Sequence, residues 1–133
     1  MADDIVELRR GEAGELFGSA PERIRHYMEI RGLGIICVPD LFGADSVRDE
    51  ARIDMLCHLE RWSEGADYER VGLDRPTETL AGVVLPRYTL PARPGGSMAT
   101  IVDVAARDHL QRKAGVSAAR RLDERLRREM QRA

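Results

Sequence analysis

Residues 28–38 read MEIRGLGIICV, an apolar run that Gly32 and Gly34 interrupt near its middle. Glycine supplies the backbone freedom of a tight turn, and short apolar flanks on each side are typical of strands. The stretch therefore predicts a strand, a turn and a second strand. The run also contains the charged residues Glu29 and Arg31. Charged side chains are rarely buried unless they are paired. Two interpretations stay open: a structural ion pair at a turn, or charged groups and glycines placed beside a ligand.

Outward from this stretch, strand patterns lie on both sides. Residues 4–9 alternate apolar and polar side chains with a period of two, and residues 53–59 form a second apolar run. Residues 63–79 are rich in Gly, Asp, Glu and Arg, which indicates a long loop of the kind that often carries function. Residues 80–90 return to a β-rich composition.

Two helices are predicted at the C-terminal end. From Ser97, apolar side chains recur every three or four residues, and serine is a favoured N-cap. Gly115 ends this helix, and a second one begins at Ser117 with an apolar stripe on an Arg-rich surface. Strands followed by helices in 133 residues predict a single α/β domain over residues 1–133.

Composition narrows the class of protein further. The chain is 43% hydrophobic and 33% charged, which is typical of a globular domain. Its longest stretch without Asp, Glu, Lys or Arg is nine residues, against the ~20 that a membrane helix needs. The acidic start differs from the basic and apolar start of a secretory signal. We therefore expect a cytoplasmic protein with no membrane partner.

Charge is unevenly distributed along the chain. The net charge is −2, yet residues 107–133 carry nine basic and four acidic side chains, so residues 1–106 are strongly acidic. A basic tail can meet an acidic or phosphorylated partner. Acids interleave this tail and no recognition motif accompanies it, so we expect no nucleic-acid partner.

Two further features could carry chemistry. The adjacent carboxylates of Asp3 and Asp4 could hold a metal or share a proton, or they could be solvated acids at the start of the chain. Residues 90–96 read LPARPGG and display Arg93 just before a predicted helix N-terminus, a combination that favours anions such as phosphate. A plain connector between a strand and a helix explains the same residues.

Four segments, in this order and spacing, resemble the C-terminal catalytic domain of HPr kinase/phosphorylase. They are ADD at 2–4, MEIRGLGII at 28–36, RVGL at 70–73 and RPG at 93–95. The match extends over most of the chain, and residues 105–126 resemble the paired C-terminal helices of the family. The resemblance implies an α/β fragment of the P-loop kinase type, similar to phosphoenolpyruvate carboxykinase, with mixed strands followed by two C-terminal helices.

The activity that the resemblance implies is protein serine phosphorylation. Family members transfer phosphate from ATP, or from pyrophosphate in some members, to a serine of the phosphocarrier HPr, and many also run the reverse phosphorolysis. The resemblance therefore implies Mg²⁺ and ATP as cofactors and HPr or a related phosphocarrier as the partner. It also implies a homo-oligomer, since relatives form hexamers.

Site residues follow from the resemblance, position by position. Asp4 is implied as the proton acceptor for the serine hydroxyl with Asp3 beside it, Glu29 as a Mg²⁺ ligand, and Arg70 as the active-site arginine. Implied phosphate or substrate loops hold Arg31, Gly32, Gly34, Arg93 and Gly95. This set agrees with the chemistry, because phosphoryl transfer needs cations against developing oxygen charge and an acid that takes the hydroxyl proton.

The sequence departs from the family pattern in two places. It contains no G-x-x-x-x-G-K-[ST] loop, whose backbone amides and Lys hold nucleotide phosphates, so we expect the chain as given not to be a competent ATP-dependent kinase. A truncated gene or a misassigned start codon would explain this. Gly96 and Ser97 stand where relatives tend to have Arg and Asn. This departure removes a cation from the phosphate-binding loop, so the resemblance supports the phosphorylase direction less than the kinase direction. The alternative hypothesis is a non-catalytic protein that binds a phosphocarrier through its Arg-rich C-terminal helix.

Overall fold

The structure of the chain is a computed structural model that describes residues 2–93 and 95–133. Pro94, the middle residue of the RPG string, and Met1 lie outside the described residues. Chain contacts divide the protein into two units. The first comprises Met1–Asp54 and Thr79–Val84, and the second comprises Met55–Glu78 and Leu85–Ala133. Each unit is described by itself.

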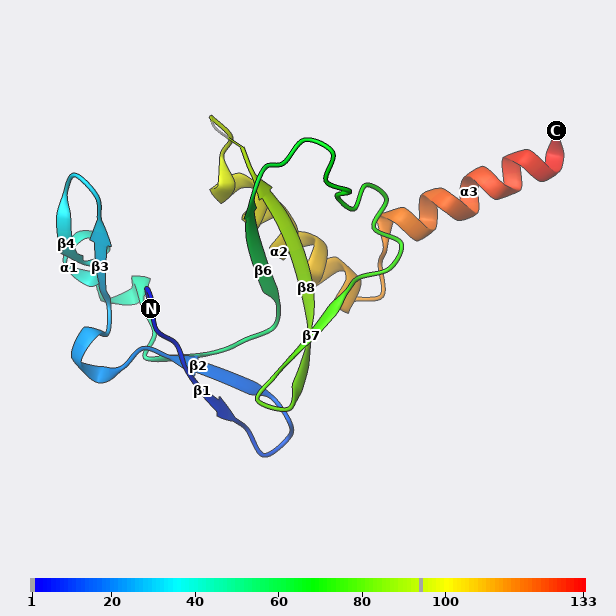
Figure 1. Cartoon of the computed structure of the whole chain (residues 1–133). Coiled ribbons are helices and arrows are strands. Elements are labelled where there is room, and N and C mark those ends of the chain that lie inside the picture. Colours follow the sequence, from blue (N-terminus) through cyan, green and yellow to red (C-terminus); the bar gives the residue numbers. More distant parts are fainter. Residues whose placement is uncertain (1, 94) are drawn as a thin grey trace. The chain divides into compact units, whose positions relative to one another are not determined.

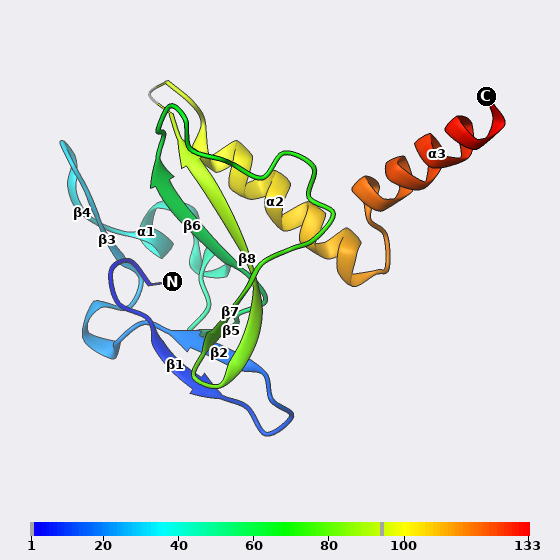
Figure 2. The same ribbon diagram turned by 45° about the vertical axis from the view of Figure 1, so that its right-hand side comes forward.

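A small antiparallel sheet organises the first unit. Its strands are β1 (Glu7–Arg10), β2 (Leu16–Ser19) and β5 (Glu50–Arg52), in the order β1-β2-β5 (Figure 2). The side chains of Arg9 and Glu50 form an ion pair of 2.6 Å across the sheet, and Arg9 also lies over the ring of Phe17. The strand predicted over residues 4–9 is present but begins later, at Glu7.

The second feature of the first unit is the hairpin that residues 28–38 predict. Its strands are β3 (Tyr27–Ile30) and β4 (Gly34–Cys37), paired antiparallel. The Leu33 N–H donates to the Ile30 carbonyl at 3.0 Å, and Gly32 between them has a φ of 86°. A positive φ at this position of a turn is what glycine allows, so the predicted strand, turn and strand are confirmed. Short helical segments flank the hairpin: η1 (Glu22–Ile24), α1 (Val38–Phe42) and η2 (Ala44–Ser46).

The sheet of the second unit has mixed pairing. Its strands are β6 (Leu56–Arg61), β7 (Thr77–Leu80) and β8 (Val83–Ala92), in the order β6-β8-β7, and the tip of the β7–β8 hairpin groups with the first unit. β6 runs parallel to β8, with Leu56 opposite Arg87 and Arg61 opposite Ala92. Parallel pairing requires a long crossover between the strands, and residues 62–76 provide part of it.

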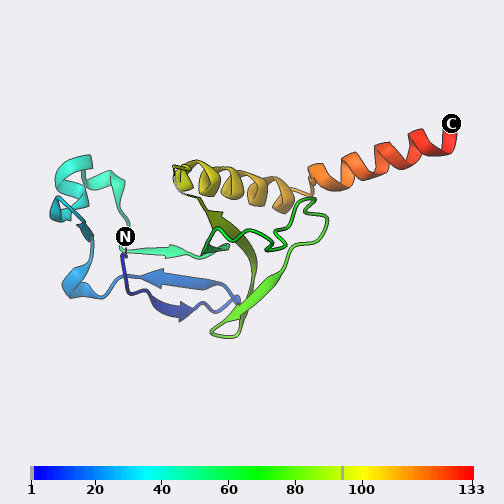
Figure 3. The same ribbon diagram turned by 45° about the horizontal axis from the view of Figure 1, so that its top comes forward.

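The two predicted helices are both present in the second unit. α2 (Met98–Lys113) is capped by the Ser97 hydroxyl, which accepts from the Thr100 N–H, and α3 (Ala118–Arg132) is capped in the same way by Ser117. α2 lies along the β6–β8 pair, whereas α3 extends beyond α2 (Figures 1 and 3). Among the described helices, none combines the length and the apolar character that a membrane span requires.

Each unit has only three buried apolar side chains among the described residues. Those of the first unit are Leu16, Ala20 and Val38, and those of the second are Leu85, Tyr88 and Ala105. The second group joins β8 to α2. These buried side chains and the polar contacts described below lie where α2 meets β8.

Candidate functional site

The site residues suggested by the sequence are divided between the two units. The first unit holds Asp3, Asp4, Glu29, Arg31, Gly32 and Gly34, and the second holds Arg70, Arg93 and Gly95. Each half is a local arrangement with its own geometry. The two halves are therefore taken in turn.

In the first unit, the acids at the start of the chain lie beside the hairpin. The Asp3 Oδ2 atom accepts a hydrogen bond from the backbone N–H of Glu29 at 3.2 Å. The side chains of Asp3, Asp4 and Glu29 are all exposed. The contact brings the adjacent carboxylates of the ADD segment to β3, the strand that carries Glu29.

The turn of the hairpin carries the other predicted residues of this half. Arg31, Gly32 and Gly34 are exposed, and the two glycines have φ values of 86° and 104°. Open space surrounds the position of a Cβ at either glycine, so backbone conformation rather than crowding requires glycine here. No ion pair joins Glu29 to Arg31 among the described residues, so the structure does not show the structural ion pair that the sequence left open.

A divalent cation would find few protein ligands in this half. Among residues 2–93 and 95–133, no three His, Cys, Asp or Glu side chains are grouped closely enough to form a metal site. Mg²⁺ is commonly held by one or two carboxylates together with substrate phosphates. Asp3, which contacts the Glu29 backbone, and Glu29 itself are carboxylates of the kind that such a shared site uses, whereas no site of three protein ligands is present among the described residues.

In the second unit, the loop around Arg70 is held by its neighbour Glu69. One Glu69 carboxylate oxygen, Oε1, accepts the backbone N–H groups of Gly72 at 2.7 Å and Val71 at 2.8 Å. These two bonds, with that of Gly72 the stronger, lower the pKa of Glu69 below its usual value. The Gly72 carbonyl accepts in turn from Arg112 Nη2 at 2.8 Å. The backbone after Arg70 is therefore fixed to α2.

Asp108 on α2 is the centre of the polar contacts behind this loop. Its Oδ2 atom accepts from Arg112 Nε at 2.7 Å, from the Tyr88 hydroxyl at 3.1 Å and from Arg75 Nη2 at 3.3 Å. Burial alone would raise the pKa of Asp108. The hydrogen bonds from Arg112 and Tyr88 outweigh this effect, so the pKa of Asp108 lies below its usual value. Burial and the bond to Asp108 raise the pKa of Tyr88. One carboxylate thus links the loop, β8 and α2.

Arg70 lines an open hollow of about 400 Å³ in this unit. The charged side chains around it are Glu69, Arg70, Arg75, Asp108 and Arg112. Arg75 and Arg112 are paired with Asp108, and Glu69 is bonded to backbone amides. Among the described residues, no ion pair engages Arg70, so its guanidinium is the one available to an anion.

Arg93 lies on another part of the second unit. Its guanidinium carbon is 3.6 Å from the centre of the Trp62 ring. Gly95 has a φ of 76°, so the connector to α2 turns here in a conformation that glycine permits. Sequence reasoning missed Trp62 as the neighbour of Arg93, because the two residues are separated by two strands in the chain.

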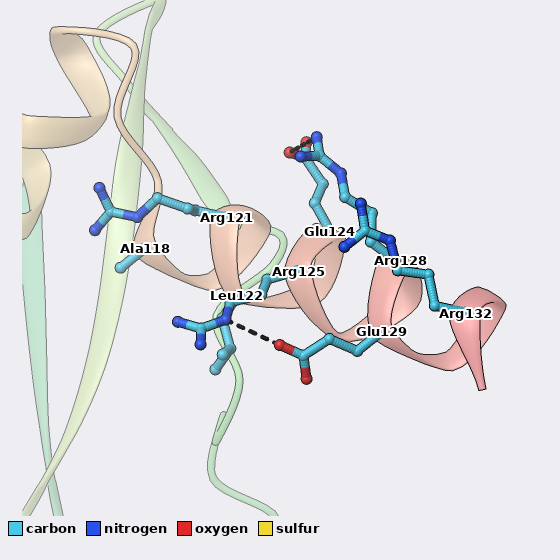
Figure 4. Close-up of a pocket in the computed structure, with 8 residues that line it drawn as sticks. All are labelled: Ala118, Arg121, Leu122, Glu124, Arg125, Arg128, Glu129 and Arg132. Atoms are coloured by element: carbon cyan, nitrogen blue, oxygen red, sulfur yellow. Dashed lines mark hydrogen bonds and ion pairs between the residues drawn. The ribbon is translucent and has the colours of Figure 1, made fainter.

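α3 carries the Arg-rich surface that the sequence predicts, and acids on the same helix neutralise several of its arginines. Figure 4 shows the residues that line a pocket along it: Ala118, Arg121, Leu122, Glu124, Arg125, Arg128, Glu129 and Arg132. Arg125 pairs with Glu129 at 3.1 Å, and other pairs along the helix join Arg127 to Asp123 and Arg128 to Glu124. Arg121 takes part in no ion pair among the described residues.

Comparison with known proteins gives a consistent result. A sequence model of the family described as "HPr Serine kinase C-terminal domain" matches residues 1–126. An HPr kinase/phosphorylase of Caldicellulosiruptor bescii is 46% identical over 132 residues, which cover 99% of this chain and 42% of that protein. HPr kinase/phosphorylase 1 of Oceanobacillus iheyensis is 46% identical over 126 residues, which cover 95% of this chain and 41% of that protein.

The fold matches a solved structure as well. The structure of the Hpr(Ser) kinase/phosphatase from Coxiella burnetii has a TM-score of 0.76 and 28% sequence identity. The match covers 86% of this chain and 69% of that one. The mixed sheet and the C-terminal helices are therefore shared with it, while the chain spans about two-fifths of the length of the curated relatives.

Proposed function

This chain belongs to the HPr serine kinase C-terminal domain family, and on that basis we propose that it serves phosphoryl transfer to a serine of HPr or a related phosphocarrier. The observation that supports this most directly is the bond from the Glu29 N–H to Asp3. It brings the acids that match the family's acceptor position to the hairpin that matches the family's EIRGLG segment. We also propose that residues 1–133 are the C-terminal part of a single catalytic domain, since the family match runs through residues 1–126.

The proposed roles follow the chemistry of each group. Asp4 takes the proton of the attacking serine hydroxyl, with Asp3 held beside it by the hairpin. Glu29 holds Mg²⁺ jointly with the phosphate donor, and a Mg²⁺ ion bound there would supply positive charge against the phosphate oxygens. Arg70 adds a guanidinium to the transferred group. Arg31, Gly32 and Gly34 shape the hairpin loop around it, and Arg93 and Gly95 form a second phosphate-binding loop.

None of the residues named above is proposed to bind the nucleotide. The 133 residues contain no G-x-x-x-x-G-K-[ST] segment, and the one lysine, Lys113, lies in no phosphate loop. We propose that the cradle for ATP is supplied by residues outside this sequence, in keeping with the share of the relatives that the chain spans. Homo-oligomer formation, which the family resemblance implies, is part of the same proposal.

A chimera tests the catalytic proposal. This chain replaces the matching 42% of the Caldicellulosiruptor bescii relative, and transfer of phosphate from Mg-ATP to HPr is measured. We expect an active chimera in which Asp4→Asn lowers kcat at least about 100-fold, because general base catalysis contributes that much. Glu12→Gln, at an exposed acid outside the site, is the matched control. A folded chimera that is inactive, or an Asp4→Asn chimera with unchanged kcat, contradicts the proposal.

A second function is favoured by α3. Its apolar side chains Leu122, Leu126 and Met130 are exposed, and Arg121 next to them carries an unpaired charge among the described residues. These features suit a non-catalytic protein that binds a phosphocarrier through this helix. Under this alternative, HPr binds the chain without nucleotide in a calorimetric titration. Arg121→Glu then weakens binding more than Arg125→Glu, because Glu129 already neutralises Arg125.

A further inference from the structure

Arg93 lies on a column of two aromatic rings in the second unit. Its guanidinium carbon is 3.6 Å from the centre of the Trp62 ring, the shortest of the three contacts of this kind among the described residues. The Trp62 ring also stacks with that of Tyr68, at 4.9 Å between ring centres and an angle of 18° between the planes. Trp62 therefore contacts both the Arg93 guanidinium and the Tyr68 ring.

Backbone bonds fix this column to the sheet. The Trp62 N–H donates to the Ala92 carbonyl at 3.0 Å, which extends the parallel pairing of β6 and β8 by one step. The Ser63 N–H donates to the Tyr68 hydroxyl at 3.0 Å. Trp62 and Arg93 thus each follow the carboxyl end of a parallel strand, the edge at which α/β sheets usually bind their ligands.

The stacked guanidinium keeps its hydrogen-bonding edge free. A guanidinium that stacks on a ring through its flat face keeps the N–H groups in its plane available for hydrogen bonds. Arg75 gives the contrast, since it lies over the Tyr88 ring at 4.0 Å and also pairs with Asp108. Arg93 takes part in no ion pair with any residue that the structure describes, and it is exposed.

We propose that Trp62 and Tyr68 are positioning residues that hold the guanidinium of Arg93 ready for a phosphoryl group. This inference rests on the proposed function, which places Arg93 in a phosphate-binding loop. The backbone does not by itself order the long side chain of Arg93, which loses much rotamer freedom when it is fixed. The aromatic column supplies the missing restraint, and it lowers the ordering cost that a flexible arginine would carry into binding.

The experiment uses the whole chain and its single tryptophan. Emission of Trp62 is first compared between the wild type and Arg93→Gln. We expect acrylamide to quench the variant more strongly, because one ring face loses its cover. Arg120→Gln, at an exposed arginine on α3, is the matched control and leaves quenching unchanged. Equal quenching in the wild type and Arg93→Gln overturns the proposal, whatever the function of the chain.

Binding of pyrophosphate is then measured by calorimetry. We expect Trp62→Leu to weaken binding about fivefold or more and Trp62→Phe to restore most of it, because a ring face is what the cation needs. Circular dichroism verifies that each variant is folded. Unchanged affinity in Trp62→Leu, with loss in Arg93→Gln, overturns the positioning role and leaves Arg93 as a phosphate ligand. A wild-type chain that binds no pyrophosphate also overturns the inference, while activity of the chimera would still uphold the proposed function.

Discussion

Asp3 accepts the backbone N–H of Glu29 at 3.2 Å, although the two residues are 26 positions apart. Glu29 lies opposite Ile35 in the hairpin, and its N–H is directed to Asp3 instead of across the ladder. A carboxylate that accepts a backbone amide is fixed in direction as well as in position. This bond therefore links the ADD segment to β3.

The Asp3–Glu29 bond can be tested through amide exchange. Asp3→Ala should speed hydrogen exchange of the Glu29 amide by about three- to tenfold, since a bond of this kind contributes roughly 0.5–1.5 kcal/mol. Asp3→Asn should leave exchange close to the wild-type rate, because its side-chain oxygen still accepts. The measurement is exchange followed by NMR. Equal rates in the wild type and Asp3→Ala would contradict the contact.

Glu69 should control access to the Arg70 peptide bond. Glu69→Ala removes the acceptor for the Val71 and Gly72 amides, so the loop opens and trypsin cuts after Arg70 several times faster. Glu69→Gln loses the same charge but keeps an acceptor oxygen, and it should be cut at an intermediate rate. Mass spectrometry identifies the fragment. The idea fails if both variants are cut at the wild-type rate.

Asp108 should carry much of the stability of the second unit. Asp108→Ala leaves Tyr88, Arg75 and Arg112 without their shared acceptor, which costs about 2–3 kcal/mol of unfolding free energy. The matched control is Asp103→Ala, which breaks an exposed helix pair with Arg107 and costs at most about 0.5 kcal/mol. Urea unfolding measures both. A loss in Asp108→Ala as small as in the control would refute the assignment.

The stabilisation from Asp108 should depend on pH with a definite sign. The folded pKa of Asp108 lies below its unfolded value, so the carboxylate stabilises the fold above the ordinary carboxyl range and loses this effect as pH falls through the folded pKa. The difference in unfolding free energy between the wild type and Asp108→Ala should be constant from about pH 5 to 7 and shrink below about pH 4. Urea titrations across this range measure it. A difference that grows on acidification has the wrong sign for this model.

The elements that the sequence predicts well are those set by local chemistry. The hairpin at residues 28–38 follows from two glycines between apolar flanks, and both C-terminal helices begin at the serines whose hydroxyls cap them. Such signals lie within a few residues of the structure that they specify. The fold class and the family resemblance were accordingly accessible without coordinates, and both are confirmed.

β2 is an element that local sequence signals do not indicate. Gly18 and Pro21 of the segment GSAP at residues 18–21 are typical of a break, yet Gly18 lies inside the central strand of the first sheet. A Cβ at Gly18 would lie 2.9 Å from a side-chain atom of Ile53 and 3.0 Å from one of Val6. This glycine is there for close packing, and its neighbours come from distant parts of the chain.

The residues of the candidate site also differ in how far the sequence predicts them. The residues that carry the resemblance could be named from their strings, but the groups that hold them could not. Asp108 gathers partners that lie 20 and 33 positions away, and Trp62 meets Arg93 only because β6 and β8 are parallel. No periodicity or spacing in one sequence reveals a contact between segments that topology alone brings together.

The parallel pairing of β6 with β8 also sets an order of events during synthesis. The two hairpins of the first unit join neighbouring segments, such as Ile30 with Gly34, and can close as soon as their residues leave the ribosome. β6 must wait for β8, because Leu56 has no partner until Arg87 has been made. Until then β6 lacks its pairing partner, and unpaired strand edges and exposed apolar surface of this kind make a nascent chain prone to aggregation.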